Sequence, residues 1–370
     1  MTNAAPPVSP VKQDGENITA QSWALVLGLA FVWGGSFLFM ELALTGITPY
    51  WLAASRVLLA AAATTVVWRW RGYVLYTTAE RASPLVILAA SVFSTTVPFT
   101  LLAWGQQFVT AGFAGVSMAA VALLVLPLAH FFADERMTLR KAIGFLIGFV
   151  GVAVLIGPDA FRSSGMVGEI PGRLACLGAA TCYAVASILM RRIPPADPVG
   201  LSAVTLWIGA ILVTAAALWV EGVPPIPPGK VLAVIVTLGL VQTALANLMR
   251  ITVIRTAGPT FMSLVNYMVP VWSVILGVIF LGEALEPTLF TAMALILVGV
   301  ALLSILGLAS FQVGSGYGLT GGSGIGAVML SAAIAFGVSV VTLYLVPRVL
   351  ERPGIDDWFT DRLLSPLGLA

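Results

Sequence analysis

The sequence predicts an all-α, multi-pass membrane protein made of two inverted five-helix repeats, ten transmembrane helices together, with a candidate eleventh hydrophobic helix near the C-terminus. Three observations predict this fold: an excess of apolar residues, a regular succession of long apolar segments, and matching landmarks in the two halves. Of the 370 residues, 59% are hydrophobic and only 9% are charged. Soluble domains carry about 25% charged residues, so too little polar surface remains here to cover a soluble globule.

The charge and motif content exclude several classes of function. The net charge is +2 and the Lys and Arg residues form no basic cluster, so we expect no nucleic-acid partner. The chain has no GxxxxGK[ST] motif, which argues against transport powered by ATP. A single histidine, His130, excludes the HExxH metal motif. We therefore expect no metal, no cofactor and no enzymatic activity.

Ten apolar segments are expected to cross the bilayer, for which a helix needs about 20 residues. An eleventh apolar segment, Ala327–Val346, follows a Gly- and Ser-rich linker, and whether it spans is open. The ten segments are Trp23–Leu44, Pro49–Val67, Pro84–Ala103, Gly112–Phe132, Ala142–Ile156, Leu174–Met190, Val199–Val220, Val231–Met249, Thr260–Leu281 and Leu289–Leu308.

The distribution of Lys and Arg predicts the orientation of these segments. With the N-terminus in the cytoplasm, the inner connections of the ten spans hold eleven Lys and Arg residues and the outer loops hold three. Cytoplasmic loops are enriched in these residues. We expect a multi-pass protein of the cell inner (plasma) membrane with a cytoplasmic N-terminus.

Landmarks recur at a nearly constant spacing in the two halves of the chain. Glu135 aligns with Glu283 and Gly151 with Gly299 at a spacing of 148 residues, and Trp33 aligns with Tyr183 at 150. The expected units are a cytoplasmic tail (1–21), a first repeat (22–157), an outer loop (158–173), a second repeat (174–308) and an atypical C-terminal extension (309–370). Because each repeat holds five spans, the second enters the membrane from the opposite side. Inverted repeats are typical of secondary transporters, which bind substrate near the midplane between the halves.

Several stretches together carry a family resemblance. They are WGGSF (Trp33–Phe37), ELAL (Glu41–Leu44), ITPYWLAASRVLLAAA (Ile47–Ala62) and VPVWSVILGVIFLGEAL (Val269–Leu285). In this order, and with degenerate counterparts in the other half, the chain resembles the drug/metabolite transporter superfamily in its EamA-type branch. The resemblance implies ten helices, a central cavity between the halves, and export or exchange of small organic solutes.

The sequence departs from that family at two positions within the repeats. Many relatives carry lysine where Glu41 stands, so the charge at this site is reversed here. Ala122 occupies the place of the helix-bending proline that Pro270 supplies in the second half.

Glu41 and Arg56 are the most informative charged residues in the apolar segments. They lie about seven residues before and after the turn at Thr48 and Pro49, so both are roughly 10 Å below the outer ends of their helices. In a helical hairpin they would meet and neutralise each other. Three interpretations stay open: a static ion pair, a pair that lines the cavity and binds a charged group or a proton, and two side chains that reach the outer interface. If protons drive transport, Glu41 is the best candidate to carry them.

The remaining candidates for the substrate cavity are polar or aromatic residues inside the apolar segments. Amides in a bilayer need partners, so Gln242, Asn247 and Asn266 should face the protein interior, either as substrate contacts or as hydrogen bonds between helices. The full set of cavity candidates is Trp33, Ser36, Glu41, Arg56, Trp104, Gln107, Tyr183, Gln242, Asn247, Asn266 and Tyr267.

The function that these observations favour is secondary transport. We expect an exporter or exchanger of small organic metabolites, such as amino acids or related compounds, that alternates access to a cavity between the repeats. Its partners would be the small-molecule substrate and the lipid bilayer, with the protein a monomer or a homodimer. The alternatives are a membrane-embedded lipid-modifying enzyme and a non-transporting receptor or scaffold.

Overall fold

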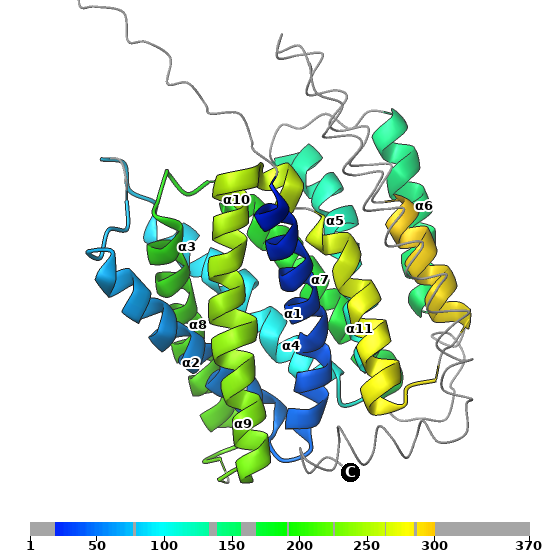
Figure 1. Cartoon of the computed structure of the whole chain (residues 1–370), viewed down its shortest axis with the longest axis horizontal. Coiled ribbons are helices and arrows are strands. Elements are labelled where there is room, and N and C mark those ends of the chain that lie inside the picture. The colour runs from blue at the N-terminus through cyan, green and yellow to red at the C-terminus, as the bar shows by residue number, and fades with distance from the viewer. Residues whose placement is uncertain are drawn as a thin grey trace, which may run out of the picture.

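A computed structural model describes residues 19–76, 79–132, 139–156, 168–190, 192–224, 226–262, 264–284 and 287–299. All the named elements in this part of the chain are helices (Figure 1). The predicted eleventh segment, Ala327–Val346, lies outside the described residues, as does the end of the tenth.

The helix bounds follow local sequence signals. Thr19 and Ser22 form a capping box at the start of α1, and prolines in the first turn begin α2, α3 and α8, where their missing N–H is unneeded. The helices of the first repeat are α1 (Ala20–Leu44), α2 (Pro49–Trp70), α3 (Pro84–Ser91), η1 (Val92–Thr96), α4 (Val97–Gly105), α5 (Ala111–Phe132) and α6 (Leu139–Ile156). Those of the second are α7 (Glu169–Met190), α8 (Pro198–Val220), α9 (Gly229–Thr237), η3 (Leu238–Leu245), α10 (Ala246–Met262) and α11 (Val265–Leu281).

Seven of the described helices are long and apolar enough to cross a membrane. They are Ala20–Leu44, Pro49–Trp70, Pro84–Gly105, Ala111–Phe132, Glu169–Met190, Pro198–Val220 and Gly229–Val253. Three shorter apolar helices, Ala142–Leu155, Met268–Leu281 and Pro287–Gly299, lie where the other three spans are expected. The helical fold and seven spans thus agree with the sequence prediction, whereas the count of ten stays a prediction.

The third span of each half contains a π-helical segment at its middle. In the first half, η1 joins α3 to α4 just before Pro98, which has no N–H to continue the α-helical pattern. In the second half, η3 joins α9 to α10, and the Thr243 hydroxyl donates to the Leu238 carbonyl five residues earlier. Such wide turns are rare and often lie at functional sites.

The two halves exchange contacts in a two-fold-related pattern. Helix α1 packs against α11, and α7, which is the counterpart of α1, packs against α5. Likewise α4 contacts α7 while α10 contacts α1, and the equivalent helices α2 and α8 contact each other. Each half therefore completes the packing of the other, which is the arrangement that an inverted duplication would give.

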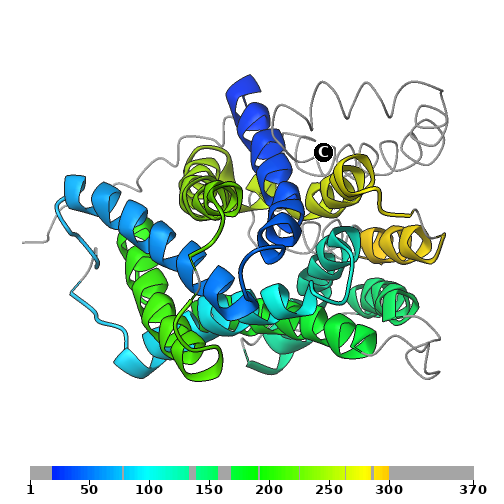
Figure 2. The ribbon, with the colours of Figure 1, turned by 90° about the horizontal axis from the view of Figure 1, so that it is seen from below.

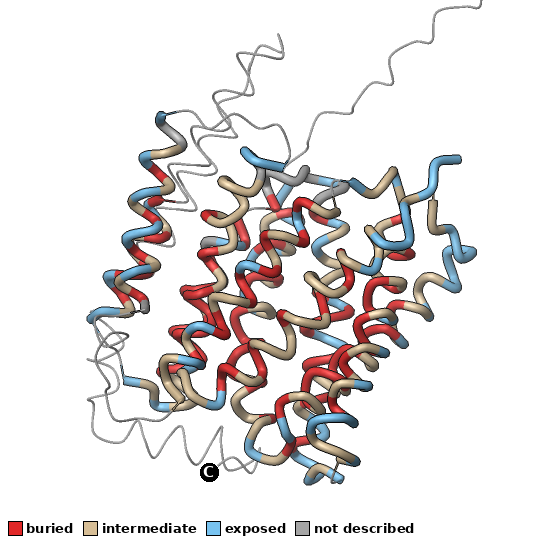
Figure 3. The backbone as a smooth tube through the Cα atoms, turned by 180° about the vertical axis from the view of Figure 1, so that it is seen from behind, coloured by how far each residue is buried: buried red, intermediate tan, exposed pale blue. Residues whose placement is uncertain are grey.

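The bundle is elongated, with different helix pairs at its two ends (Figures 1 and 2). The α2–α8 pair lies at one end, and α6 with helix Pro287–Gly299 lies at the other. Buried residues follow the faces where helices meet (Figure 3). The outer surface carries many large apolar side chains, among them Leu146, Phe149 and Ile211, which are 59%, 54% and 63% exposed. Such a surface suits lipid contact.

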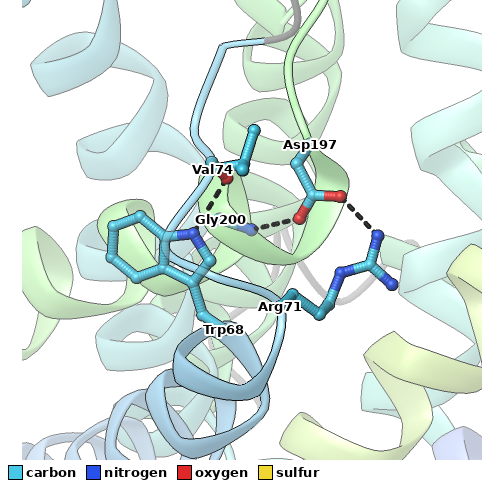
Figure 4. Close-up of polar contacts among 5 residues, drawn as sticks. All are labelled: Trp68, Arg71, Val74, Asp197 and Gly200. Atoms are coloured by element: carbon cyan, nitrogen blue, oxygen red, sulfur yellow. Dashed lines mark hydrogen bonds and ion pairs between the residues drawn. The ribbon is translucent and has the colours of Figure 1, made fainter.

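Carboxylates hold both ends of the antiparallel α2–α8 pair. At its Arg71 end, Asp197 accepts from the Gly200 N–H as the N-cap of α8 and pairs with Arg71 at 2.7 Å (Figure 4). At its Thr48 end, Glu221 follows α8 and accepts from the Thr48 hydroxyl and from the N–H groups of Tyr50 and Trp51 at the start of α2. The N-terminus of α8 is therefore capped by its own N-cap residue Asp197, and the N-terminus of α2 is capped by Glu221 from the end of α8.

Candidate functional site

Arg56 of α2 lies at the centre of a polar cluster between the two halves. Its side chain is buried, with the residue 6% exposed. Its Nε donates to Thr243 Oγ1 of η3 at 2.8 Å, and its Nη1 lies 3.2 Å from Met40 Sδ of α1. The guanidinium carbon stacks over the Phe99 ring of α4, 4.6 Å from its centroid. Tyr183 of α7 is close enough to interact electrostatically with this group. The first and second repeats thus meet at one buried cation.

The expected ion pair between Glu41 and Arg56 is absent from the described part of the structure. Arg56 contacts η3 and α4 instead, and Glu41 lies near the start of α5. The prediction assumed that α1 and α2, joined by a short turn, pack along each other. In the structure α1 packs mainly on α11, and α2 packs mainly on α8 and η3, so the two charges point to different neighbours.

Two carboxylates gather at the N-terminus of α5. Glu283, in the turn after α11, accepts from the Ala111 N–H at 2.6 Å and from the Gly112 N–H at 3.0 Å. Gly282 takes a left-handed conformation, with φ of 64°, and this turn directs Glu283 back toward α5. Glu41 approaches the same helix end, and its Oε2 is buried with no hydrogen-bond partner. The positive end of the α5 dipole favours negative charge at this place.

Burial raises the pKa of the Glu283 carboxyl to about 7, the Glu41 charge adds to the rise, and the N–H groups of Gly112 and Ala111 oppose it. The ordinary value is 4.5. The folded protein therefore holds this proton more tightly than the unfolded chain between these pH values, and stability falls as pH rises through them. We expect the apparent melting temperature in detergent to decline from pH 4.5 to 7, and Glu283→Gln to flatten this decline.

The exposed residue Glu80 provides the control for this pH dependence. The Glu80→Gln variant should keep the wild-type slope. A slope that persists unchanged in Glu283→Gln would contradict the assignment.

On the helices that contact Arg56 or adjoin those contacts, several buried polar atoms have no hydrogen-bond partner in the described structure. They include Ser36 Oγ of α1, Thr96 Oγ1 of η1 and Gln242 Oε1 of η3. Thr96 and Gln242 lie in the two π-helical segments, one in each half. Buried polar groups are nearly always hydrogen-bonded, so unpartnered ones indicate a place where a ligand or water binds.

The other predicted cavity residues are only partly brought together. Asn247 donates to Ser202 Oγ at 2.7 Å, which joins α10 to α8. Trp33 and Tyr183 are half-buried and pack against the core, and Trp104 contacts the Phe108 ring at 5.0 Å.

Two amides expected in the protein interior, Gln107 and Asn266, are exposed instead. Gln107 is exposed, whereas its neighbour Gln106 is 4% exposed and donates to the Phe37 carbonyl at 3.0 Å. Asn266 is exposed at the start of α11 rather than buried. The Tyr267 side chain lies outside the described residues.

Three residues with buried polar or cation contacts were not among the candidates from the sequence: Thr243, Phe99 and Gln106. Thr243 directly follows the chosen Gln242, so a search for hydroxyls beside buried amides would have found it. Phe99 could not be distinguished from ordinary apolar residues, because nothing in the sequence shows which phenylalanine faces a cation. Among the described residues, no group of three His, Cys, Asp or Glu side chains could hold a metal ion.

A family model described as the EamA-like transporter family matches the chain twice, over residues 21–157 and 170–305. The chain belongs to the EamA-like transporter family. The duplication expected from the sequence is therefore present, and the protein is a multi-pass membrane transporter in its broad class. Members of the EamA-like family are transporters, not enzymes.

The chain is similar over more than half of its length to two curated transporters and to one solved structure. The chain is 23% identical over 223 residues to the uncharacterized transporter YvbV of Bacillus subtilis (strain 168). The aligned region covers 59% of this chain and 71% of that protein. It is 22% identical over 202 residues to the uncharacterized transporter YoaV of the same strain. The aligned region covers 54% of this chain and 67% of that protein. A crystal structure aligns with a TM-score of 0.53 at 20% identity, over 77% of this chain and 98% of that one. This last likeness concerns the fold alone.

Proposed function

We propose that this EamA-like protein is a secondary transporter that exports or exchanges small organic metabolites, such as amino acids or related compounds. It works by alternating access to a site between its two inverted halves. The protein lies in the plasma (inner) membrane with its N-terminus in the cytoplasm, and it acts as a monomer or homodimer. The bias of Lys and Arg toward the inner connections supports this orientation.

The observation that carries the proposal is the exchange of contacts between the halves around a polar centre. Because α1 packs on α11 and α7 on α5, a rocking motion of one half against the other changes both interfaces together. The Arg56 cluster draws its members from α1, α2, α4 and η3, so it lies across this junction. Polar groups kept at the junction of two apolar halves mark a substrate path.

The test is flux through the purified full chain in proteoliposomes. Labelled amino acids and other small metabolites are loaded inside, and their release is followed with and without a pH gradient and with unlabelled solute outside. Saturable flux above that of empty liposomes is the expected result. Catalytic turnover of lipid with no flux would favour the membrane-embedded enzyme, and neither activity would favour a receptor or scaffold.

We further propose that Glu41 exchanges the coupling proton, together with Glu283. Glu41 Oε2 is buried without a partner, and Glu283 is bound to the same helix end by two N–H groups. Arg173 of α7 pairs with Glu169 and stacks over Phe113, which lies in the first turn of α5. A proton bound between the two acids would relieve the repulsion of their charges.

Replacing Glu41 by glutamine should therefore abolish the response of transport to a pH gradient. Exchange of labelled for unlabelled solute at equal pH should persist, because it requires no net proton movement. The measurement is solute flux at matched protein density, with and without the gradient. Loss of both activities together, or of neither, would contradict a role specific to the proton.

A further inference from the structure

We infer that Arg56, which donates to Thr243, binds the carboxylate of the transported solute, and that Ser36 and Gln242 on the adjoining helices α1 and η3 bind the rest of it. This inference rests on the proposed transport function and specifies the chemistry of its substrate: a small organic acid or amino acid with an anionic carboxylate beside a hydrogen-bond donor.

The first observation is a buried cation with no acidic partner. Arg56 is 6% exposed, and its contacts are the Thr243 hydroxyl, the Met40 sulfur and the Phe99 ring. Among the residues that the structure describes, no carboxylate pairs with it. An arginine stays protonated in proteins, so it cannot avoid the cost of burial by releasing its proton. An anionic ligand would supply the missing counter-charge.

The second observation concerns the donors that remain on Arg56. Thr243 occupies the Nε–H, Met40 lies at Nη1, and Nη2 makes no hydrogen bond to the described residues. Phe99 covers the face of the guanidinium and leaves its edge for other contacts. The edge formed by Nη1 and Nη2 has the fork geometry that binds both oxygens of a carboxylate.

The third observation is a pair of unpartnered polar atoms on neighbouring helices. Gln242 Oε1 and Ser36 Oγ are buried without hydrogen bonds, in residues that are 3% and 6% exposed. The Gln242 amide lies beside α1 at Gly35, where a Cβ would be 3.9 Å from Nε2, and Gln242 adjoins Thr243 in η3. An amide oxygen and a hydroxyl accept hydrogen bonds, so they suit the ammonium or N–H group of a solute whose carboxylate is on Arg56.

The fourth observation is that the fold does not need a cation at this position. Helices α2 and α8 are equivalent in the two repeats, both begin with proline, and Arg56 and Thr205 are each the eighth residue. Thr205 is buried too, and its hydroxyl donates to the Leu201 and Ser202 carbonyls of its own helix. In the second half this position is occupied by Thr205, whose hydrogen bonds stay within its own helix. The charge of Arg56 in the first half therefore serves something besides packing.

The experiment compares acids with their neutral esters. Purified full-length protein in detergent is titrated with the twenty L-amino acids, pyruvate and succinate, and with the methyl ester of each, and binding is followed by thermal shift and calorimetry. We expect at least one acid to bind and its ester to bind at least about tenfold more weakly. The Arg56→Gln variant should bind the acid at least about tenfold more weakly than the wild type. The Arg56→Lys variant, which keeps the charge without the fork geometry, should have an affinity between these two.

Arg69→Gln is the matched control, because Arg69 is an exposed arginine of the same helix. This variant should bind like the wild type. The inference is overturned if esters bind as tightly as acids, if no acid binds, or if folded Arg56→Gln binds like the wild type. Should Arg56→Gln fail to fold, the comparison of acid with ester in the wild type decides.

The outcomes separate this inference from the proposed function. Flux of neutral solutes without any binding of acids overturns the role of Arg56 and leaves transport standing. Binding of acids at Arg56 without flux of any solute overturns transport and leaves the carboxylate site standing.

Discussion

Replacing Gly34 by alanine is expected to destabilise the protein, whereas the same change at Gly35 is not. A Cβ on Gly34 would lie 2.5 Å from Trp272 Cβ, 3.1 Å from the Val269 carbonyl oxygen and 3.2 Å from the Ser273 nitrogen. These atoms belong to the backbone and Cβ positions of α11, which cannot move without shifting the helix. Overpacking of this kind typically costs about 1–3 kcal/mol. The contact joins the first span of one half to α11 of the other, so the variant should loosen the junction between the halves.

The adjacent glycine provides the control. A Cβ on Gly35 would meet Leu276 Cδ1 at 3.5 Å and Gln242 Nε2 at 3.9 Å, which are ordinary contacts. Alanine also restricts the unfolded chain, which favours the folded state by roughly 0.5–1 kcal/mol. The measurement is the apparent melting temperature in detergent, together with the monodisperse fraction in size-exclusion chromatography. Equal melting temperatures for the two variants would show that α1 and α11 are not in close contact.

Replacing Glu221 by alanine is expected to release the start of α2. The N-cap residue Thr48 makes no side-chain cap of its own, and the Glu221 carboxylate instead accepts from its hydroxyl and from the N–H groups of Tyr50 and Trp51. Hydrogen bonds to charged groups contribute about 1.5–3 kcal/mol when buried, and this group is half-buried, so we expect a loss of roughly 1–2 kcal/mol.

Two further variants at the Thr48 end separate the bonds. Glu221→Gln keeps one acceptor oxygen, so it should lose less stability than the alanine variant. Thr48→Ala removes only the hydroxyl and leaves both backbone bonds, so its effect should be smaller still. Hydrogen exchange of the first turn of α2 measures the result at the site. Unchanged protection of Tyr50 and Trp51 in Glu221→Ala would rule out capping by Glu221.

Helix positions could be predicted because prolines and long apolar runs define them locally. Pro49 begins α2, Leu44 ends α1 and Leu281 ends α11, all as expected from the sequence. The π-helical segment Leu238–Leu245 of the eighth span contains no proline, so no local signal in the sequence marks it, and it packs against α2.

The candidate site was harder to predict because almost every residue around it is apolar. Gln107 is exposed whereas its neighbour Gln106 is buried, and in a helix one residue is a rotation of about 100°, which the sequence alone does not resolve. Glu41 and Arg56 do not pair in the described structure, because α1 and α2 follow each other in the sequence but pack on different helices. The inverted halves pack across each other instead, so the partner of Arg56 is Thr243, far away in the chain.

The two ends of the α2–α8 pair differ in how they respond to ionic strength. At the Arg71 end the contact is an ion pair whose arginine side chain is 42% exposed, and salt screens such pairs over a Debye length of about 8 Å at physiological concentration. At the Thr48 end the donors are a hydroxyl and two amides, which carry no net charge. Added salt therefore weakens the Arg71 end more than the Thr48 end, and a rise in ionic strength on the Arg71 side of the membrane shifts the balance toward the contacts at the Thr48 end.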